Sequence, residues 1–328
     1  MRPLAIALAV LVAPVAALAQ GGPSFDCAKA TSTVEQAICK VPEVAKADRE
    51  MSMVYAALAA KLAGPAKDDL VKDQIRWIAN RNRACHGDAA AITNCLKARY
   101  ATRTANLRIL GEGVYPFVSE QAINNRGEVG KISYTIDIGY PQFNGTTADF
   151  SAVNRHYADD ARKNAGEVTP NVAADADRAQ EWSYEQSFTL HRPGANAVTI
   201  DLDFYGYSGG AHGFGGTICT LVDLRTGRMT GPDDVFATGD QWLTFMVETV
   251  GSALKKQFVK NPGFDDALRP ATLGKMLRDA SHYCWRADKL ELIFNPYDVG
   301  PYSAGPYSVE IAYARLKPLL RADGPLGR

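Results

Sequence analysis

Six cysteines restrict the fold of this chain more than any other feature of its sequence. An even number of cysteines in an exported chain usually forms disulfides, because the thiols meet an oxidising compartment. Four lie in the first third of the sequence and two far downstream; in chain order they are Cys27, Cys39, Cys85, Cys95, Cys219 and Cys284. This grouping predicts a small disulfide-stapled module followed by a larger domain with one bridge, Cys219–Cys284, worth roughly 4 kcal/mol.

The first 19 residues predict a secretory signal peptide. Arg2 is the only charge before an apolar run from Leu4 to Leu18, and Ala19 completes the small-residue pattern that a signal peptidase requires. The run is about 15 residues long, shorter than the roughly 20 that cross a bilayer as a helix. We therefore expect a periplasmic or secreted protein with no membrane span after signal cleavage.

The charge distribution argues against a nucleic-acid partner. Residues 20–110 carry 14 Lys/Arg against 9 Asp/Glu, whereas residues 111–328 carry 21 against 27. A nucleic-acid-binding protein would concentrate basic side chains on one face. The acidic second part is instead suited to a basic protein partner through charge complementarity.

Residues 20–110 predict a small helical bundle. Ser32 and Glu35 form a capping-box pattern, which predicts that a helix begins at residue 33. Pro42 suits the first turn of a second helix, along which an apolar residue recurs every three or four positions. Two further helices are expected at 66–84 and 88–110.

The four cysteines of this module allow three pairings, and the sequence leaves all three open. Short connections make neighbouring helices antiparallel, which places Cys39 near Cys85 and favours the pairs Cys39–Cys85 and Cys27–Cys95. Zinc is the competing explanation, but spacings of 12, 46 and 10 contain no close Cys-x-x-Cys pair. The five histidines are scattered, so we expect no metal and no cofactor.

One series of residues spans nearly all of the front module and includes its four cysteines. Its members are Phe25, Asp26, Cys27, Glu35, Gln36, Ala37, Ile38, Cys39, Asp48, Tyr55, Gln74, Trp77, Arg81, Cys85, Cys95, Tyr100 and Arg103. The series resembles the LprI-type lysozyme inhibitor N-terminal domain, in residues 24–110. This resemblance implies a periplasmic or secreted helical domain, which in its namesake is associated with inhibition of lysozyme.

Several of these residues also have a purely structural explanation. Trp77 and Tyr100, at helical spacing, are expected in the core of the bundle. Asp48 is expected to form an ion pair with Arg81 or Arg103 that holds the helices in register. None of them predicts a reaction centre, and we expect no enzymatic activity.

Residues 115–325 predict a second domain, of mixed α+β type with a mainly antiparallel sheet, so the fold class of the whole chain is α+β. Alternating apolar and polar residues predict strands, which are expected at 131–138, 182–192, 197–207, 217–223, 290–294 and 307–313. Helices are expected at 150–164, 241–260 and 271–279. Pro141–Gly145 is expected to turn the chain.

A glycine-rich loop is the sharpest local feature of the second domain. Five of the nine residues from Ser208 to Gly216 are glycine, which lets the backbone adopt positive φ and approach another surface closely. The loop lacks the Lys-Ser/Thr of a P-loop and the strand–helix context of a dinucleotide fingerprint. His212 has no nucleophile motif beside it, and we expect it to bond within its own loop.

A second series of residues also has a counterpart in a known family. Its segments are Asp203–His212, Asp223–Arg228, Asp234–Phe236 and Phe294–Gly305. They resemble the RsiV-type extracellular domain, which occurs in lysozyme-sensing anti-sigma factors and beside some peptidoglycan deacetylase domains. The resemblance implies a mixed α+β fold and a role in the cell envelope. We expect neither the transmembrane signalling of those sensors nor a deacetylase activity in this chain.

We therefore predict an exported, non-enzymatic binding protein of the cell envelope whose protein partner is lysozyme or a related muramidase. Aromatic side chains beside flexible glycines are suited to protein contact. The residues predicted to bind the partner are Tyr205, Tyr207, Ser208, Gly209, Gly210, His212, Tyr297 and Tyr302. Two alternatives remain: a peptidoglycan-associated hydrolase using carboxylate pairs such as Asp201/Asp203 or Asp233-Asp234, and a passive peptidoglycan-binding scaffold.

Overall fold

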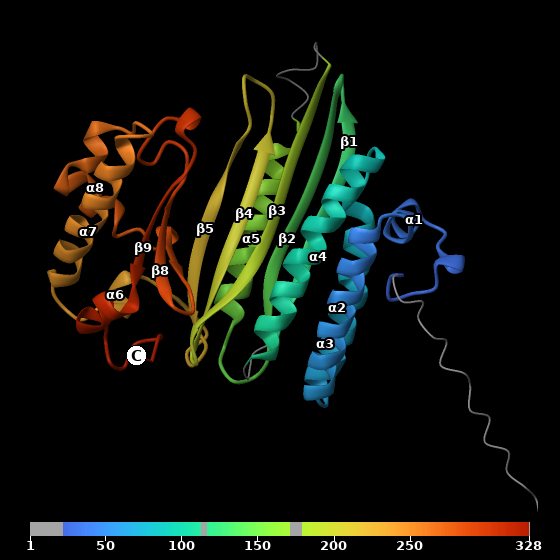
Figure 1. Ribbon diagram of the computed structural model, residues 1–328, viewed down its shortest axis with the longest axis horizontal. Coiled ribbons are helices and arrows are strands. Elements are labelled where there is room, and N and C mark those ends of the chain that lie inside the picture. Colours follow the sequence, from blue (N-terminus) through green and yellow to red (C-terminus); the bar gives the residue numbers. More distant parts are fainter. Residues whose placement is uncertain (1–21, 113–116, 171–178, 328) are drawn as a thin grey trace, which may run out of the picture.

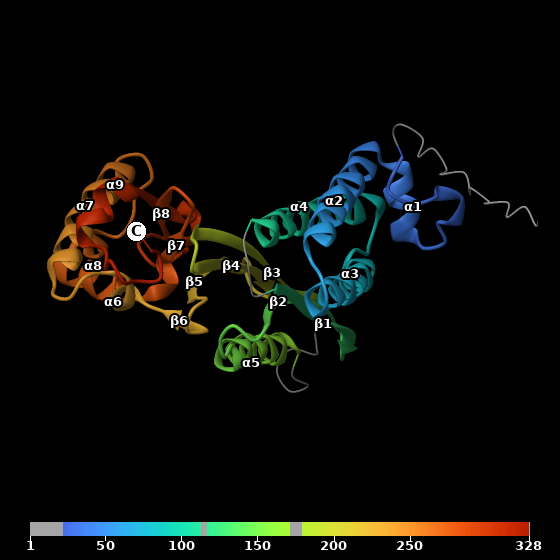
Figure 2. The ribbon, with the colours of Figure 1, turned by 90° about the horizontal axis from the view of Figure 1, so that it is seen from below.

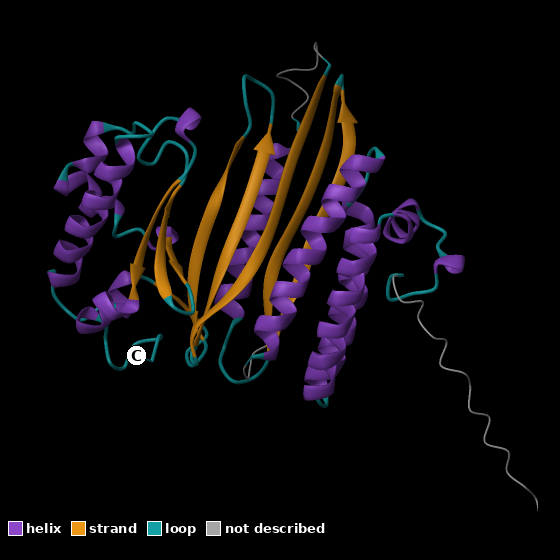
Figure 3. Ribbon diagram, in the orientation of Figure 1, coloured by secondary structure: helices purple, strands orange, loops and turns teal. Residues whose placement is uncertain are grey.

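The computed structural model describes residues 22–112, 117–170 and 179–327. The expected signal peptide lies outside this range. Along the longest axis, a helical bundle is followed by a large sheet and then by a small sheet with its own helices (Figure 1). The predicted fold class is confirmed: a disulfide-bonded helical bundle precedes an α+β region whose strands, drawn in orange in Figure 3, are mostly antiparallel.

The bundle contains the four predicted helices, which are α1 (Thr33–Lys40), α2 (Pro42–Lys61), α3 (Pro65–Ala84) and α4 (Ala89–Gly111). The capping box forms, because the Ser32 hydroxyl accepts a hydrogen bond from the Glu35 amide at 3.1 Å and the Glu35 carboxylate accepts from the Ser32 amide at 3.0 Å. Trp77 and Tyr100 are buried with their ring centroids 5.4 Å apart, as expected of core aromatics. None of the helices in the described ranges is both long and apolar enough to cross a membrane.

The favoured disulfide pairing in the bundle is wrong. The bridges are Cys27–Cys39 and Cys85–Cys95, which close 12 and 10 residues of chain. The prediction assumed that α2 and α3 form a tightly packed hairpin, whereas α2 packs mainly along α4 and α3 packs along the first strand of the large sheet. Each cysteine therefore finds its partner across the nearest turn.

The expected ion pair of Asp48 with an arginine is replaced by a relay through a tyrosine. The Tyr100 hydroxyl donates to Asp48 Oδ1 at 2.7 Å, and Arg81 donates to the same hydroxyl at 2.5 Å. Arg103 pairs with a different carboxylate, Asp73, at 2.7 Å. Because Tyr100 lies between the charges, the helices are tied together by a buried chain of hydrogen bonds.

The large sheet has six strands in sequence order, all pairs antiparallel except β2–β3. Its strands are β1 (Phe117–Val129), β2 (Ile132–Asn144), β3 (Gln180–Gly194), β4 (Ala197–Tyr207), β5 (Phe214–Asp223) and β6 (Arg228–Thr230). Helix α5 (Ser151–Val168) lies in the β2–β3 connection and packs on one face of the sheet, because parallel neighbours require a crossover. Figure 2 shows α4 on the opposite face.

The small sheet and its helices form the C-terminal part. Its strands are β7 (Tyr283–Trp285), β8 (Lys289–Phe294) and β9 (Tyr307–Ala312), and the helices around them are α6 (Pro232–Val235), α7 (Gln241–Phe258), α8 (Pro270–Met276) and α9 (Tyr313–Leu316). The predicted Cys219–Cys284 disulfide is confirmed and joins β5 to β7. It therefore fastens the small sheet to the outer edge of the large one.

Polar contacts fix the bundle on the large sheet. The buried carboxylate of Asp73 accepts from Arg103 on α4 at 2.7 Å and from the Glu120 amide on β1 at 2.8 Å. The Asn106 side chain, also on α4, donates to the Phe188 carbonyl at 2.9 Å and accepts from the Leu190 amide at 2.8 Å. These directional bonds leave little freedom for one part to slide over the other.

Candidate functional site

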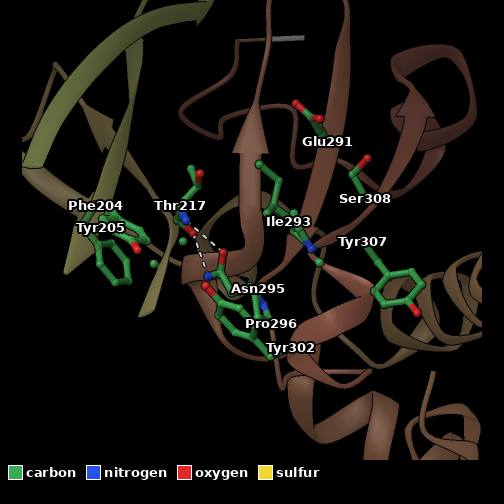
Figure 4. Close-up of a pocket in the computed structure, with 14 residues that line it drawn as sticks. Phe204, Tyr205, Thr217, Glu291, Ile293, Asn295, Pro296, Tyr302, Tyr307 and Ser308 are labelled. Atoms are coloured by element: carbon green, nitrogen blue, oxygen red, sulfur yellow. Dashed lines mark hydrogen bonds between the residues drawn. The ribbon is translucent and has the colours of Figure 1, made fainter. Parts of the chain in front are cut away.

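The two predicted partner-binding loops lie against each other, although more than 80 residues separate them in sequence. We call residues 205–213 and 297–305 together the aromatic loop surface. The first loop joins β4 to β5, and the second lies between β8 and β9. Figure 4 shows Tyr205 and Tyr302 from the two loops at the cleft that separates the two sheets.

Glycines give the first loop its tight path. Gly209 and Gly210 have φ values of 89° and 96°, a conformation that side-chain-bearing residues rarely adopt. The Tyr207 hydroxyl donates to the Gly210 carbonyl at 3.0 Å and closes the turn. A Cβ at Gly213 would lie 2.3 Å from the Tyr205 hydroxyl, so only glycine fits there.

His212 connects the two loops. Its ring stacks on the Tyr302 ring, with centroids 3.9 Å apart and planes at 15°. Nδ1 lies 2.7 Å from the Gly213 carbonyl, which bears out the expected bond within its own loop, and Nε2 lies 3.4 Å from the Tyr297 hydroxyl. No ion pair joins His212 to a carboxylate in the described parts of the chain, and its ring is held by the Gly213 carbonyl and the Tyr302 ring.

Tyr297 has a strained backbone. Its φ is 77°, and it is the one non-glycine residue of the described chain with positive φ. Such a conformation persists only where its surroundings impose it, and it is found mainly at functional sites. Here the Tyr297 amide donates to the Gly300 carbonyl at 2.9 Å, and the Asp298 amide donates to the Asn295 carbonyl at 3.0 Å. This turn leaves the Tyr297 side chain 59% exposed.

Asn295 holds the second loop against β5. Its side-chain Oδ1 accepts from the Thr217 amide at 2.8 Å, and its Nδ2 donates to the Thr217 carbonyl at 3.0 Å, as the dashed lines in Figure 4 show. The amide thus takes the place of one residue of a neighbouring strand. It bounds a cleft of about 560 Å³ between β5 and the small sheet, with Tyr205 and Tyr302 in its lining.

Asp298 also helps to hold the second loop, residues 297–305, in place. Its Oδ2 accepts from the Asn295 amide at 2.6 Å and lies 3.8 Å from Nδ1 of the buried His282. Burial raises the pKa of the Asp298 carboxyl, although the nearby His282 acts in the opposite direction. This group is held by the protein itself and is poorly placed to act on a ligand.

The structure brings some of the predicted site residues together and leaves others apart. His212, Tyr297 and Tyr302 form one contact cluster, and Tyr205 lies across the cleft. Tyr207, Ser208, Gly209 and Gly210 form the outer turn. Sequence reasoning missed Asn295 as the residue that holds the second loop against β5; an asparagine directly after a strand and before a proline was the available signal.

Three of the four carboxylates considered for hydrolysis, Asp201, Asp203 and Asp234, have structural partners. Asp201 is buried and pairs with Arg286 at 2.6 Å and His191 at 3.2 Å. Asp203 accepts from the Thr217 hydroxyl at 2.6 Å. In α6, the Asp234 carboxylate accepts from the amide of residue 231 at 2.9 Å as a helix cap.

One group of possible metal ligands occurs in the described residues, made of Asp201, Cys219 and Cys284. The two sulfurs are joined to each other as a disulfide. A metal ligand must be a thiolate. The oxidised protein therefore lacks two of the three ligands that this cluster would need.

Three family models match separate stretches of the chain. Residues 27–107 match the lysozyme inhibitor LprI, residues 129–215 match the deacetylase PdaC, and residues 233–314 match DUF3298, a protein family of unknown function. The predicted LprI-type domain is thereby confirmed. The second part of the chain carries PdaC-like and DUF3298 matches, and its RsiV-type resemblance stays a prediction.

Comparison with solved structures gives two matches at low identity and low TM-score. The crystal structure of a DUF3298 family protein from Pseudomonas aeruginosa PAO1 is 18% identical, with 64% of this chain and 95% of that chain covered and a TM-score of 0.44. A DUF3298 family member from Bacteroides fragilis NCTC 9343 is 16% identical, with 64% and 96% covered and the same TM-score of 0.44. The comparison with curated proteins gives no match.

Proposed function

We propose that this protein is a non-enzymatic binding protein of the cell envelope that recognises a lysozyme or a related muramidase. The observation that carries the proposal is the aromatic loop surface, in which two loops from different sheets are fixed to each other with exposed aromatic side chains. The LprI match over residues 27–107 supports lysozyme as the partner. Tyrosine is among the residues that contribute most to binding energy at protein interfaces.

The surface is suited to binding because its shape is set before a partner arrives. The His212–Tyr302 stack and the Asn295–Thr217 bonds fix the two loops, so little side-chain freedom remains to be lost on association. Residues 111–328 also carry 21 basic against 27 acidic side chains. A basic partner would be attracted to this part by the opposite sign of its charge.

The disulfides support an extracytoplasmic location for this function. All six cysteines are paired and no free cysteine occurs in the described residues. Disulfides persist in oxidising compartments and are rare in reducing ones. An envelope protein would also meet lysozyme in that compartment.

The test is a calorimetric titration of the oxidised mature protein with hen-type and endogenous lysozymes, combined with an assay of lysozyme activity. We expect micromolar or tighter binding to at least one of them. Tyr302→Ala removes the ring that stacks on His212, and we expect it to weaken binding tenfold or more. Met229→Ala is the matched control, because Met229 is also exposed but lies far from the aromatic loop surface. It lies on β6, which pairs with the other end of β5.

Two outcomes would contradict the proposal. If none of the lysozymes tested binds at micromolar concentration, the proposed function is wrong. Loss of binding in Ile75→Arg, on the exposed side of α3, with full binding by Tyr302→Ala would place the contact on the helical bundle instead. Lysozyme turnover in the presence of each variant then reports whether binding also inhibits.

A further inference from the structure

A second cleft, of about 770 Å³, lies between α4 and the face of the large sheet that α5 does not cover. We call it the α4 groove. Its lining comes from the helical bundle on one side and from strands β1 to β4 on the other. Figure 2 shows the helix and the sheet that form its two sides. The groove exists only because the bundle is fixed on the sheet.

Each of four neighbouring strands contributes one carboxylate to the floor of the groove. The four are Glu120 on β1, Asp137 on β2, Glu185 on β3 and Asp203 on β4. Asp137, Glu185 and Asp203 lie close together because Asp137 is paired with Glu185 across the parallel β2–β3 ladder, and Asp203 is opposite Ser187, two residues beyond Glu185. Glu120 is opposite Pro141 and reaches the group from β1, with its carboxyl carbon 3.7 Å from where a Cβ of Gly139 would lie. The side chains that α4 contributes to the opposite side of the groove are small, so they leave space above the floor. They are Ala91, Cys95, Ala98 and Thr102.

The acidic charge of the floor is only partly neutralised. Arg99 and Arg103 are the two arginines among the described lining residues, and Arg103 is already paired with the buried Asp73 at 2.7 Å. Asp137 accepts from the Asn124 side chain at 2.9 Å and lies 4.0 Å from His86, so the charge that is left without a basic partner is that of Glu185 and Asp203. Glu185 is exposed and takes part in no described ion pair, and Asp203 is exposed with a hydroxyl as its partner. The groove therefore has an excess of negative charge.

Glu120 gives an independent reason to place a basic group in the groove. The residue is only 9% exposed and its Oε1 is buried, yet this oxygen accepts no hydrogen bond from any described residue. The nearest cation, Arg99, lies 3.8 Å from this oxygen, which is beyond hydrogen-bond distance. Buried acceptors are nearly always satisfied, and an orphan calls for a partner. Burial also raises the pKa of this carboxyl, which reflects the same lack of solvation.

We propose that the α4 groove binds an extended basic peptide segment, with an arginine or lysine side chain that donates to Glu120 and a second basic side chain near Glu185 and Asp203. Strands lie about 4.8 Å apart, so the floor from β1 to β4 is about 14 Å wide. An extended chain covers that width with about four residues. Charge selects a peptide of this kind over a neutral glycan, because charge-assisted hydrogen bonds to carboxylates are about twice as strong as neutral ones.

The inference goes beyond the proposed function and does not depend on it. The groove lies on the α4 side of Tyr205, whereas the cleft of the aromatic loop surface lies on the side of the small sheet. A test with a short peptide in place of lysozyme keeps the two proposals separate.

The test measures fluorescence anisotropy of a labelled six-residue peptide of alternating arginine and glycine, titrated with the oxidised mature protein. We expect saturable binding that weakens between 50 and 300 mM salt. Glu120→Gln should weaken it tenfold or more, and Glu185→Gln about threefold. Glu181→Gln is the matched control, since Glu181 is an exposed carboxylate on the same strand outside the groove, and it should change the affinity less than twofold.

Three results would overturn the inference. The first is the absence of saturable binding by the unmodified protein. The second is an equal loss in Glu181→Gln and Glu185→Gln, which would show attraction to the acidic surface in general. The third is direct binding of a chitin tetrasaccharide that displaces no peptide and that Glu185→Gln abolishes. This result would make the groove a glycan site. Melting temperatures of the variants confirm that each is folded.

Discussion

The buried ion pair between Asp73 and Arg103 should be the most sensitive point of the junction between bundle and sheet. Asp73 is 0% and Arg103 3% exposed, with Oδ2 and the guanidinium 2.7 Å apart. Replacement of Arg103 by methionine keeps most of the side-chain volume but leaves the Asp73 carboxylate buried without its partner. Removal of one member of a buried pair costs about 3–5 kcal/mol.

Two details of the site place the expected cost near the lower end of that range. Asp73 keeps the hydrogen bond from the Glu120 amide at 2.8 Å, and Arg76 remains 3.7 Å from its other oxygen. Loss of the bonds from Arg103 to Gln74, at 2.8 and 3.2 Å, adds a smaller cost, because the group left without them is a neutral amide and not a charge. We therefore expect Arg103→Met to lower the free energy of unfolding by about 3 kcal/mol.

The assay is urea unfolding of the oxidised mature protein, followed by far-ultraviolet circular dichroism. The control is Arg108→Met, the same change on the same helix, where Arg108 and Glu50 form an ion pair that is 55% and 44% exposed. An exposed pair contributes under about 1 kcal/mol. The double variant Asp73→Asn/Arg103→Met should recover about half of the loss, because the unpaired charge is gone.

The reasoning is refuted if Arg103→Met is no more destabilising than Arg108→Met. It is also refuted if the double variant is less stable than Arg103→Met alone. In that case the carboxylate would be stabilised by its other neighbours, and the ion pair would contribute little to the junction.

Three further predictions concern other parts of the molecule. Cysteine-to-serine replacement of both Cys219 and Cys284, which close 65 residues, should destabilise the protein by about 4 kcal/mol, against about 3 for Cys85 and Cys95, which close 10. An equal or smaller loss for the Cys219/Cys284 variant in denaturant unfolding would contradict loop entropy as the cause. Burial raises the pKa of the Glu120 carboxyl above its ordinary 4.5, so the folded state binds this proton more tightly and stability falls as the pH rises above about 4.5. Glu120→Gln should therefore raise the melting temperature at pH 7 but not at pH 4, and an unchanged difference between the two pH values would contradict this. Asn295→Asp places a carboxylate oxygen against the Thr217 carbonyl and should cost about 1–3 kcal/mol, so a melting temperature equal to that of the unmodified protein would show that the clamp is dispensable.

Local signals made the helices of the bundle predictable. The Ser32 capping box and Pro42 each mark a helix start through contacts within one turn of chain, so no knowledge of tertiary packing is needed. The disulfide pairing depends instead on which helices pack together. Because α2 packs along α4, the assumption of an α2–α3 hairpin gave the wrong partners for Cys39 and Cys85.

The sheet was predictable where one face is buried along the whole strand. β1 was missed because, after its buried first four residues, it becomes polar and exposed and shows no alternation. Pro141 predicted a turn, yet it lies within β2. Beyond Ile138 that strand pairs only with β1, and a proline is tolerated on such an edge.

The two aromatic loops could be predicted from their glycines and tyrosines, since those residues mark the loops locally. Their contact through His212 and Tyr302 could not, because it depends on how β5 and the small sheet meet. The α4 groove was not predictable for the same reason. In sequence its carboxylates are ordinary polar positions of strands, and only the strand register and the position of α4 bring them to one side.

The six cysteines bond in consecutive pairs along the sequence: first to second, third to fourth, fifth to sixth. A chain that enters an oxidising compartment from its N-terminus reaches this pattern if every new thiol simply joins the one exported before it. We expect folding in the envelope to need an oxidase but no reshuffling by an isomerase.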